Sequence, residues 1–156
     1  MRTNEAAGFL GMVTTLLLAG GCAGTPAKDS PSSDARAAIA GLALSMVGVQ
    51  YRYGGANPDD GFDCSGLVYY TYSSNGHVVP RTSQAQFKAA RKIALADAAE
   101  GDLLFFHDQE KLSHVGIYLG DGRFVHAPSS GDTVRVASID APYYQRHLVA
   151  VGRLLP

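Results

Sequence analysis

The sequence has no tryptophan, only two cysteines, and no excess of charge of either sign. Its 156 residues carry 13 Lys and Arg against 14 Asp and Glu, which gives a formal net charge of -1. Because no basic block is present, the electrostatic footprint of a nucleic-acid-binding protein is missing, and we expect no nucleic-acid partner. Two cysteines are also too few for a disulfide-rich scaffold or a four-cysteine zinc site.

The sequence does contain enough apolar material for one ordinary core. Hydrophobic residues make up 46% of the chain and charged residues 17%. An average soluble domain has about 25% charged residues, so intrinsic disorder of the whole chain is excluded. The length suits a single domain and is too short for two domains with separate large cores.

The first 22 residues have the layout of an export signal. Arg2 precedes an apolar stretch over 6–21, which glycine and threonine interrupt and which is shorter than the roughly 20 residues that a spanning helix needs. The residues before Cys22 are similar to the lipobox of bacterial lipoproteins, although Ala19 stands where that motif usually has Leu. We therefore predict a lipoprotein signal peptide over 1–21, with a plain signal peptide as the alternative.

This resemblance implies that Cys22 is lipidated and cannot pair with Cys64 in a disulfide. Several acyl chains on one residue give stable membrane anchoring. Since Ala23 and not Asp follows the cysteine, the resemblance further implies an outer-membrane location facing the periplasm. The small, Pro and Ser residues over 22–33 predict a flexible tether, or alternatively a frayed terminus. The folded domain is expected over 34–156.

Within this domain, helix signals come first and strand signals follow. Helices are predicted over 34–47 with Asp34 as the N-cap, over 64–74 with Asp63 as the N-cap, and from 82–83 onward, where Ser83 and Gln86 have the spacing of a capping box. Short apolar segments separated by Gly-Asp turns predict strands over 103–106, 115–119, 123–126, 133–136 and 148–154. This order predicts an α+β domain in which N-terminal helices pack on an antiparallel sheet of about five or six strands.

Cys64 is the candidate nucleophile, because it falls at a predicted helix N-terminus. The aligned N–H groups there lower the pKa of a thiol. A thiol nucleophile also needs a histidine base and a group that orients it. His114 and His126 lie on two predicted strands twelve residues apart, and a hairpin would bring them side by side.

Each of these residues has another interpretation. A single cysteine is often only a small buried hydrophobe. The two histidines and Cys64 could bind zinc, although no His-Glu motif supplies the base of a catalytic zinc site. The remaining histidines, His77, His107 and His147, are expected at the surface or in structural positions.

The motifs around these residues resemble, in order along the chain, the NlpC family of bacterial cell-wall cysteine peptidases. The resemblance extends from about Ile39 to the C-terminus. It is carried by five segments: Tyr51-Arg52-Tyr53-Gly54-Gly55, Asp63-Cys64-Ser65-Gly66, Pro80-Arg81-Thr82-Ser83-Gln84, Gly101-Asp102-Leu103 and 114–120 (HVGIYLG), with His126 after them.

The resemblance implies a papain-like fold without cofactor or metal. Cys64 would be the nucleophile, His114 the base and acid, and His126 the residue that orients His114. The hydroxyl of Tyr51 would help the Cys64 backbone N–H to stabilise the oxyanion. Asp63, Ser65 and Arg81 would contact the substrate. Alternatively, Asp63 only caps the helix, and Arg81 only pairs with an acidic neighbour. Tyr53 would be a packing residue.

The function that follows from the resemblance is that of a monomeric murein endopeptidase. Its substrates would be peptidoglycan stem peptides, and the bond cleaved would be D-Ala to diaminopimelate or γ-D-Glu to diaminopimelate, with a slight preference for the first. A lipid anchor on Cys22 would hold it in the cell envelope. The alternatives are a non-catalytic wall-binding lipoprotein and a thiol amidase or acyltransferase that acts on another amide.

Overall fold

Three helices precede the six-stranded main sheet along the chain, as predicted. The computed structural model describes residues 31–108 and 111–156. Its elements are α1 (Pro31–Ser45), β1 (Ala56–Asn57), β2 (Gly61–Phe62), α2 (Cys64–Ser74), α3 (Ser83–Ala89), β3 (Arg91–Ile93), the 3₁₀ helix η1 (Leu95–Asp97), β4 (Leu103–Asp108), β5 (Lys111–Gly120), β6 (Arg123–His126), β7 (Arg135–Ser138), α4 (Pro142–His147) and β8 (Leu148–Arg153). The predicted α+β class is confirmed.

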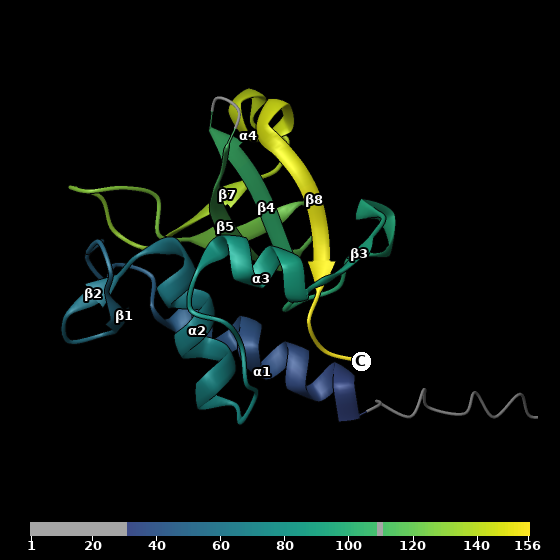
Figure 1. Ribbon diagram of the computed structural model, residues 1–156, viewed down its shortest axis with the longest axis horizontal. Coiled ribbons are helices and arrows are strands. Elements are labelled where there is room, and N and C mark those ends of the chain that lie inside the picture. Colours follow the sequence, from purple (N-terminus) through teal and green to yellow (C-terminus); the bar gives the residue numbers. More distant parts are fainter. Residues whose placement is uncertain (1–30, 109–110) are drawn as a thin grey trace, which may run out of the picture.

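The main sheet has six strands in the order β3-β8-β4-β5-β6-β7, and every pairing is antiparallel. Strands β4 to β7 follow one another as neighbours, and β8 returns to pair with the free side of β4. The short strands β1 and β2 form a separate two-stranded sheet. Figure 1 shows α1, α2 and α3 gathered along one side of the main sheet, with α4 at the far end of β4 and β8.

Strand β4 separates two hydrophobic cores. Leu103 and Phe105 pack with the residues of α1 and α2, whereas Leu104 and Phe106 face the second core, where Tyr144 of α4 packs. All four β4 side chains are at most 1% exposed. Side chains of a strand alternate between its two faces, so a strand covered on both faces is apolar throughout.

The first helix begins earlier than predicted. The sequence predicts Asp34 as the N-cap, but α1 starts at Pro31, since the fixed φ of proline suits a first helical turn. The last three residues of the predicted tether are therefore helical. The helix ends before Gly48, which has a φ of +95°. The predicted signal peptide, Cys22 and the rest of the tether lie outside the described residues.

Five short elements, β1, β2, β3, η1 and α4, were not predicted from the sequence, and the cap of α3 was assigned wrongly. Strand β3 and helix α4 are short and carry little periodicity. His147, expected at the surface or in a structural position, is the last residue of α4. Thr82, not Ser83, caps α3, and the amide of Gln86 donates to the carbonyls of Ser65 and Pro80.

A buried ion pair joins the start of β4 to the end of β8. Arg153 donates from Nε and Nη2 to the two carboxylate oxygens of Asp102, at 2.9 and 2.6 Å. The Asp102 side chain is only 1% exposed. This pair joins the ends of two inner strands, β4 and β8, on the side of the sheet remote from α4.

Among the described residues, no helix has both the length and the apolar character that crossing a membrane requires.

Candidate active site

Cys64 is the first residue of α2, as predicted, and Asp63 caps the helix. Oδ1 of Asp63 accepts a hydrogen bond from the Gly66 backbone N–H at 2.6 Å. A Cβ on Gly66 would lie 1.9 Å from the carbonyl oxygen of Gly55, so glycine is required where the two backbones approach. This close contact sets the turn of α2 that carries the thiol against the Gly54-Gly55 segment.

The thiol lies against the part of β5 that carries His114. Sγ of Cys64 is 3.8 Å from the carbonyl oxygen of Ser113. The expectation of a lowered pKa is wrong. Burial raises the pKa of Cys64 and the charge of Asp63 adds to this, which together outweigh the hydrogen bonds from backbone N–H groups, chiefly that of Val115. Cys64 is therefore a protonated thiol in the free protein.

The two predicted histidines are brought together by the β5–β6 hairpin. Ile117 pairs with Val125, so the antiparallel register places His126 opposite Gly116 and diagonal to His114. Nε2 of His114 lies 2.8 Å from Nδ1 of His126, and this distance is that of a hydrogen bond. Nδ1 of His114 has no hydrogen-bond partner among the described residues.

Both imidazoles are neutral near pH 7. Burial lowers the pKa of His114 to about 4. Burial also lowers the pKa of His126 to about 3, with His114 and the Arg135 guanidinium acting in the same direction. A protonated imidazole at this place would have little water and a cationic neighbour, so the neutral form is favoured. A neutral His114 can accept a proton, as a base must.

Tyr51 faces the same cleft as the thiol. This cleft has a volume of about 560 Å³ and is lined by Tyr51, Cys64, Asp63, Ser65, Arg81, Ser113 and their neighbours. Burial raises the pKa of Tyr51, and so do the nearby Cys64 and Asp63. The Tyr51 hydroxyl therefore keeps its proton at neutral pH and can donate a hydrogen bond into the cleft.

Asp63, Ser65 and Arg81 form one hydrogen-bonded cluster that lines the cleft. Arg81 binds both carboxylate oxygens of Asp63, at 2.9 and 2.8 Å, and also donates to Ser65 Oγ at 3.1 Å. Burial favours a higher pKa for Asp63, but the Arg81 hydrogen bonds and the Gly66 N–H outweigh it and hold the pKa below its usual range. Asp63 is thus both the helix cap and the ion-pair partner of Arg81.

A second cavity, of about 590 Å³, adjoins the first and lies on the histidine side. Ser113 lines both cavities, while His114 and His126 line only the second. Its other walls include Arg135 and Tyr144. Cys64 and His114 thus lie between the two cavities. A substrate bond placed between the thiol and the imidazole would have one cavity for the groups on each of its sides.

Sequence reasoning missed two residues that line these cavities. Tyr53, expected to pack, is 89% exposed and lines the thiol cleft. Tyr144 comes from the unpredicted α4, and its hydroxyl lies 3.2 Å from Nε2 of His126. A Tyr-Tyr pair in a polar segment gave no signal that distinguished it from a loop.

The other three histidines do not join the thiol and the histidine pair. His77 follows the end of α2, where its ring contacts Tyr72. His107 lies on β4, and its ring centroid is 5.5 Å from that of His147. Among residues 31–108 and 111–156, no group of three or more His, Cys, Asp or Glu side chains is arranged to hold a metal ion.

The chain is similar in sequence to known proteins. The bifunctional muramidase/DL-endopeptidase CwlT of Bacillus subtilis (strain 168) is 41% identical over 115 residues, which cover 72% of this chain and 34% of CwlT. The murein DD-endopeptidase MepH of Escherichia coli (strain K12) is 38% identical over 117 residues, which cover 72% of this chain and 43% of MepH.

A solved structure extends the likeness to three dimensions. The crystal structure of a lipoprotein-like NLP/P60 family protein from Staphylococcus aureus subsp. aureus Mu50 superimposes with a TM-score of 0.72 at 34% identity, covering 87% of this chain and 45% of that one. In all three comparisons the matched stretch is less than half of the other protein.

A helix-borne cysteine packed against an antiparallel sheet that carries the histidines defines a papain-like fold. Residues 48–153 match the NlpC/P60 family. The chain belongs to the NlpC/P60 family, so the family and the fold predicted from the sequence motifs are both confirmed.

Proposed function

We propose that this domain is a cysteine endopeptidase that hydrolyses an amide bond in peptidoglycan stem peptides or their cross-links. The observation that carries the proposal is the thiol of Cys64, packed against the strand segment of His114, whose imidazole is hydrogen-bonded to His126. The substrate class is supported by the relatives, which are named as a DL-endopeptidase and a murein DD-endopeptidase.

In the proposed first step, Cys64 gives its proton to Nδ1 of His114 as its sulfur attacks the carbonyl carbon of the scissile amide. The carbonyl oxygen becomes an oxyanion that accepts hydrogen bonds from the Cys64 backbone N–H and the Tyr51 hydroxyl. Loss of one such donor typically raises the barrier by about 2.7–4 kcal/mol. Because Tyr51 keeps its proton, it can supply this hydrogen bond at neutral pH.

In the second step, the imidazolium of His114 gives its proton to the leaving amine as the C–N bond breaks. Since His114 lines the second cavity, the leaving group occupies that cavity and the acyl group stays in the Cys64 cleft. A water molecule then takes the place of the amine, gives a proton to His114 and cleaves the thioester. Cys64 regains its proton, and a carboxylic acid leaves.

Two bonds fit this mechanism. One is the D-Ala to diaminopimelate cross-link, and the other is the γ-D-Glu to diaminopimelate bond inside a stem. Among the relatives, MepH is named for the first geometry, DD, and CwlT for the second, DL. We favour the cross-link, the bond geometry for which the relative MepH, a murein DD-endopeptidase, is named.

We propose that the protein acts in the cell envelope, held at the outer membrane by a lipid on Cys22. The support is the sequence before Cys22, with its apolar stretch and small residues, and Ala23 after it. Metabolic labelling with a radioactive fatty acid tests this, since Cys22→Ser should abolish incorporation. Labelling that persists in Cys22→Ser would refute the anchor.

The function is tested by mass spectrometry of soluble fragments released from diaminopimelate-type sacculi by the purified protein. Wild type should release fragments whose masses identify the bond, and Cys64→Ala should release none. His114→Ala should lower turnover by about 10⁴, and His126→Ala by less, because nucleophile and base remain in place. His77→Ala is the matched control and should retain full activity.

The outcomes separate the proposed function from its rivals. Equal release by wild type and Cys64→Ala would refute the mechanism. No release from sacculi or from isolated muropeptides, with a Cys64 that iodoacetamide does not label, would favour a non-catalytic wall-binding protein. No release with a reactive Cys64 would favour an amidase or acyltransferase that acts on another amide.

A further inference from the structure

The second cavity, which the leaving group of the proposed reaction occupies, contains one permanent cation. Arg135 of β7 and Asp132 of the preceding loop both line it. Among the described residues that line this cavity, Arg135 is the one side chain with a fixed positive charge and Asp132 the one carboxylate. His114 and His126 line it as neutral imidazoles, because burial lowers the pKa of each. Arg135 is therefore the group of this cavity that attracts an anion.

The pairing of β6 with β7 places Arg135 beside the histidine pair. Arg135 is directly opposite His126 in the antiparallel register. Directly opposed residues project from the same face of a sheet, with Cβ atoms about 4.5–5.5 Å apart. Nδ1 of His126 is in turn 2.8 Å from Nε2 of His114. The guanidinium therefore extends from the same face of the sheet as the two imidazoles.

Arg135 has donors left for a ligand, unlike the arginine of the thiol cleft. Arg81 makes four hydrogen bonds with the protein, two of them with Asp63. Arg135 donates from Nη1 to Asp132 at 3.4 Å, and its side chain is 51% exposed. A guanidinium has five N–H donors, so this bond leaves donors that can bind a carboxylate.

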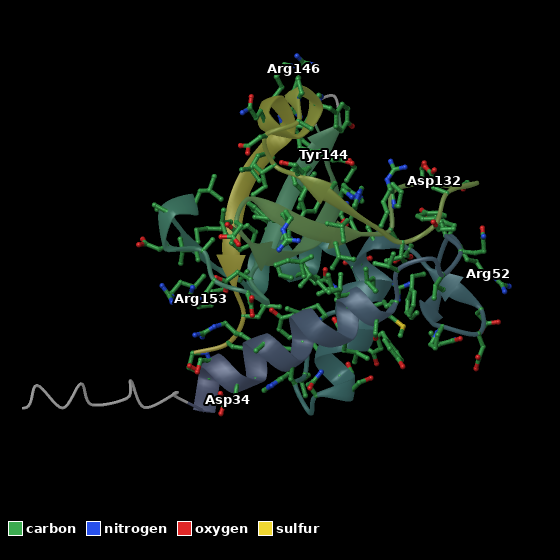
Figure 2. The ribbon with its side chains drawn as sticks, turned by 180° about the vertical axis from the view of Figure 1, so that it is seen from behind. Asp34, Arg52, Asp132, Tyr144, Arg146 and Arg153 are labelled. Carbon is green, nitrogen blue, oxygen red and sulfur yellow. The ribbon has the colours of Figure 1, made fainter. Side chains whose placement is uncertain are left out.

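A loop and a helix border the cavity. Oδ2 of Asp132 accepts a hydrogen bond from Ser129 Oγ at 3.0 Å, and the Asp132 backbone carbonyl accepts one from the Tyr51 N–H at 2.9 Å. Tyr144 of α4 also lines the cavity. Figure 2 shows Tyr144 between α4 and the sheet, with Arg146 on the outer side of the same helix. The loop that holds Asp132 is thus tied by its backbone to Tyr51 of the thiol cleft.

The leaving group of a cross-link fits these walls. When the D-Ala to diaminopimelate bond breaks, the released amine is attached to a carbon that also bears a free carboxylate. This carboxylate therefore stays close to the histidine that protonates the amine. The aromatic rings of Phe106, Tyr143 and Tyr144 line the same cavity and offer an apolar wall to the methylene chain of diaminopimelate.

The other candidate bond fits less well. When the γ-D-Glu to diaminopimelate bond breaks inside a stem, the carbon that bears the released amine carries a carbonyl that continues into the next amide. The free carboxylate then lies at the far end of the diaminopimelate side chain. A cation opposite His126 therefore matches the cross-link.

We propose that Arg135 binds the free carboxylate of the leaving diaminopimelate and so selects the D-Ala to diaminopimelate cross-link. The proposal rests on the proposed function and names the recognition on its leaving-group side. Asp132 competes with the substrate for the guanidinium, because its own carboxylate already pairs with Arg135.

The first test compares two cross-linked muropeptide dimers that differ only at this carboxyl group, which is free in one and a carboxamide in the other. The wild type should cleave the free-carboxylate dimer with a kcat/KM about 10- to 100-fold higher, the effect expected from hydrogen bonds to a charged group. Arg135→Gln should reduce this ratio to less than about threefold, mainly through slower cleavage of the carboxylate dimer. An unchanged ratio in Arg135→Gln would overturn the proposal.

A second substitution separates carboxylate binding from a role in holding the loop. Asp132→Asn removes the competing charge and keeps a side-chain oxygen for Ser129. The preference for the carboxylate dimer should rise roughly two- to fivefold, as expected for loss of an exposed ion pair. If Arg135 served only as the partner of Asp132, both substitutions would lower cleavage of both dimers alike, and this result would overturn the proposal.

The matched control is Arg146→Gln. It removes the same charge from exposed α4, and Arg146 does not line the cavity. The preference for the carboxylate dimer should stay unchanged. A loss equal to that in Arg135→Gln would show that the preference reports only the net charge of the protein, which would also overturn the proposal.

Binding to Cys64→Ala tests the site without turnover. In isothermal titration calorimetry, the carboxylate dimer should bind about tenfold or more tightly than the carboxamide dimer, and Arg135→Gln in the same background should abolish the difference. Equal binding of the two dimers, or no binding of either, would refute the carboxylate site. If the wild type releases no fragments but Cys64→Ala shows the difference, the proposed function fails and the carboxylate site stands.

Discussion

Replacing Asp63 by Asn separates the two tasks of this carboxylate. Asparagine caps a helix as well as aspartate does, so the bond from the Gly66 N–H to Oδ1 is kept. The second side-chain atom becomes an NH₂ group, which cannot accept from Arg81 Nη2 or from the Gly54 N–H. The substitution therefore removes the charge and two hydrogen bonds while α2 keeps its cap.

The substitution has two effects, one on stability and one on the pKa of Cys64. The Asp63 side chain is 14% exposed and that of Arg81 34%, so Arg81 keeps some water when its partner is lost. Breaking a fully buried pair costs about 3–5 kcal/mol, and we expect about 2–4 kcal/mol here. The negative charge of Asp63 raises the pKa of Cys64, and removing it leaves the thiol beside the Arg81 cation. The pKa of Cys64 should therefore fall as the protein becomes less stable.

Urea unfolding and the pH dependence of iodoacetamide labelling measure these two effects on the same samples. Asp60→Asn is the matched control, because Asp60 pairs with Arg52 at 3.3 Å on the surface, where both side chains are more than 60% exposed. Asp60→Asn should lower the free energy of unfolding by less than about 1 kcal/mol and leave the pH midpoint of Cys64 labelling unchanged. A midpoint of labelling that stays the same or rises in Asp63→Asn would refute the electrostatic account of the thiol.

Two further predictions concern stability. Arg153→Ala leaves the Asp102 carboxylate, which is 1% exposed, without its cationic partner. The free energy of unfolding in urea should therefore fall by about 3–5 kcal/mol, and a loss below about 1 kcal/mol would contradict the stabilising role of this ion pair. The lowered pKa of His114, about 4, and of His126, about 3, means that the unfolded chain, with histidine pKa near 6.5, binds protons first on acidification. Stability should therefore be full above about pH 6.5 and fall towards pH 4, by about 3 kcal/mol from His114 alone, with a shallower decline in His126→Asn.

The parts of the fold that could be predicted are those with strong local signals. Helix α2 begins at Cys64 because Asp63 caps it, and strand β6 is found at 123–126 as predicted. The hairpin that joins the two histidines followed from their spacing around a Gly-Asp turn. These features depend on residues close together in the sequence, so the sequence alone determines them.

The missed parts depend on contacts between distant segments. Helix α4 has six residues, too few for a periodic pattern, and it is held by the packing of Tyr144 on Phe106 and Phe124. The capping box at Gln86 failed for the same reason, since its amide binds the carbonyl of Ser65 in another helix. Tyr144 could not be recognised as a neighbour of His126 until the fold placed α4 over the sheet.

The pKa of Cys64 also depends on contacts that form only in the folded protein. A helix N-terminus favours a thiolate, but burial and the charge of Asp63 are stronger here, and burial also keeps His114 neutral. The free site therefore holds a thiol and a neutral imidazole in place of an ion pair. Proton transfer to His114 must then accompany the attack on the carbonyl, which makes the position of a single hydrogen on His114 decisive. In the proposed mechanism, that hydrogen lies on Nε2 of His114, which is bound to Nδ1 of His126, so that Nδ1 of His114 is left to take the proton of Cys64.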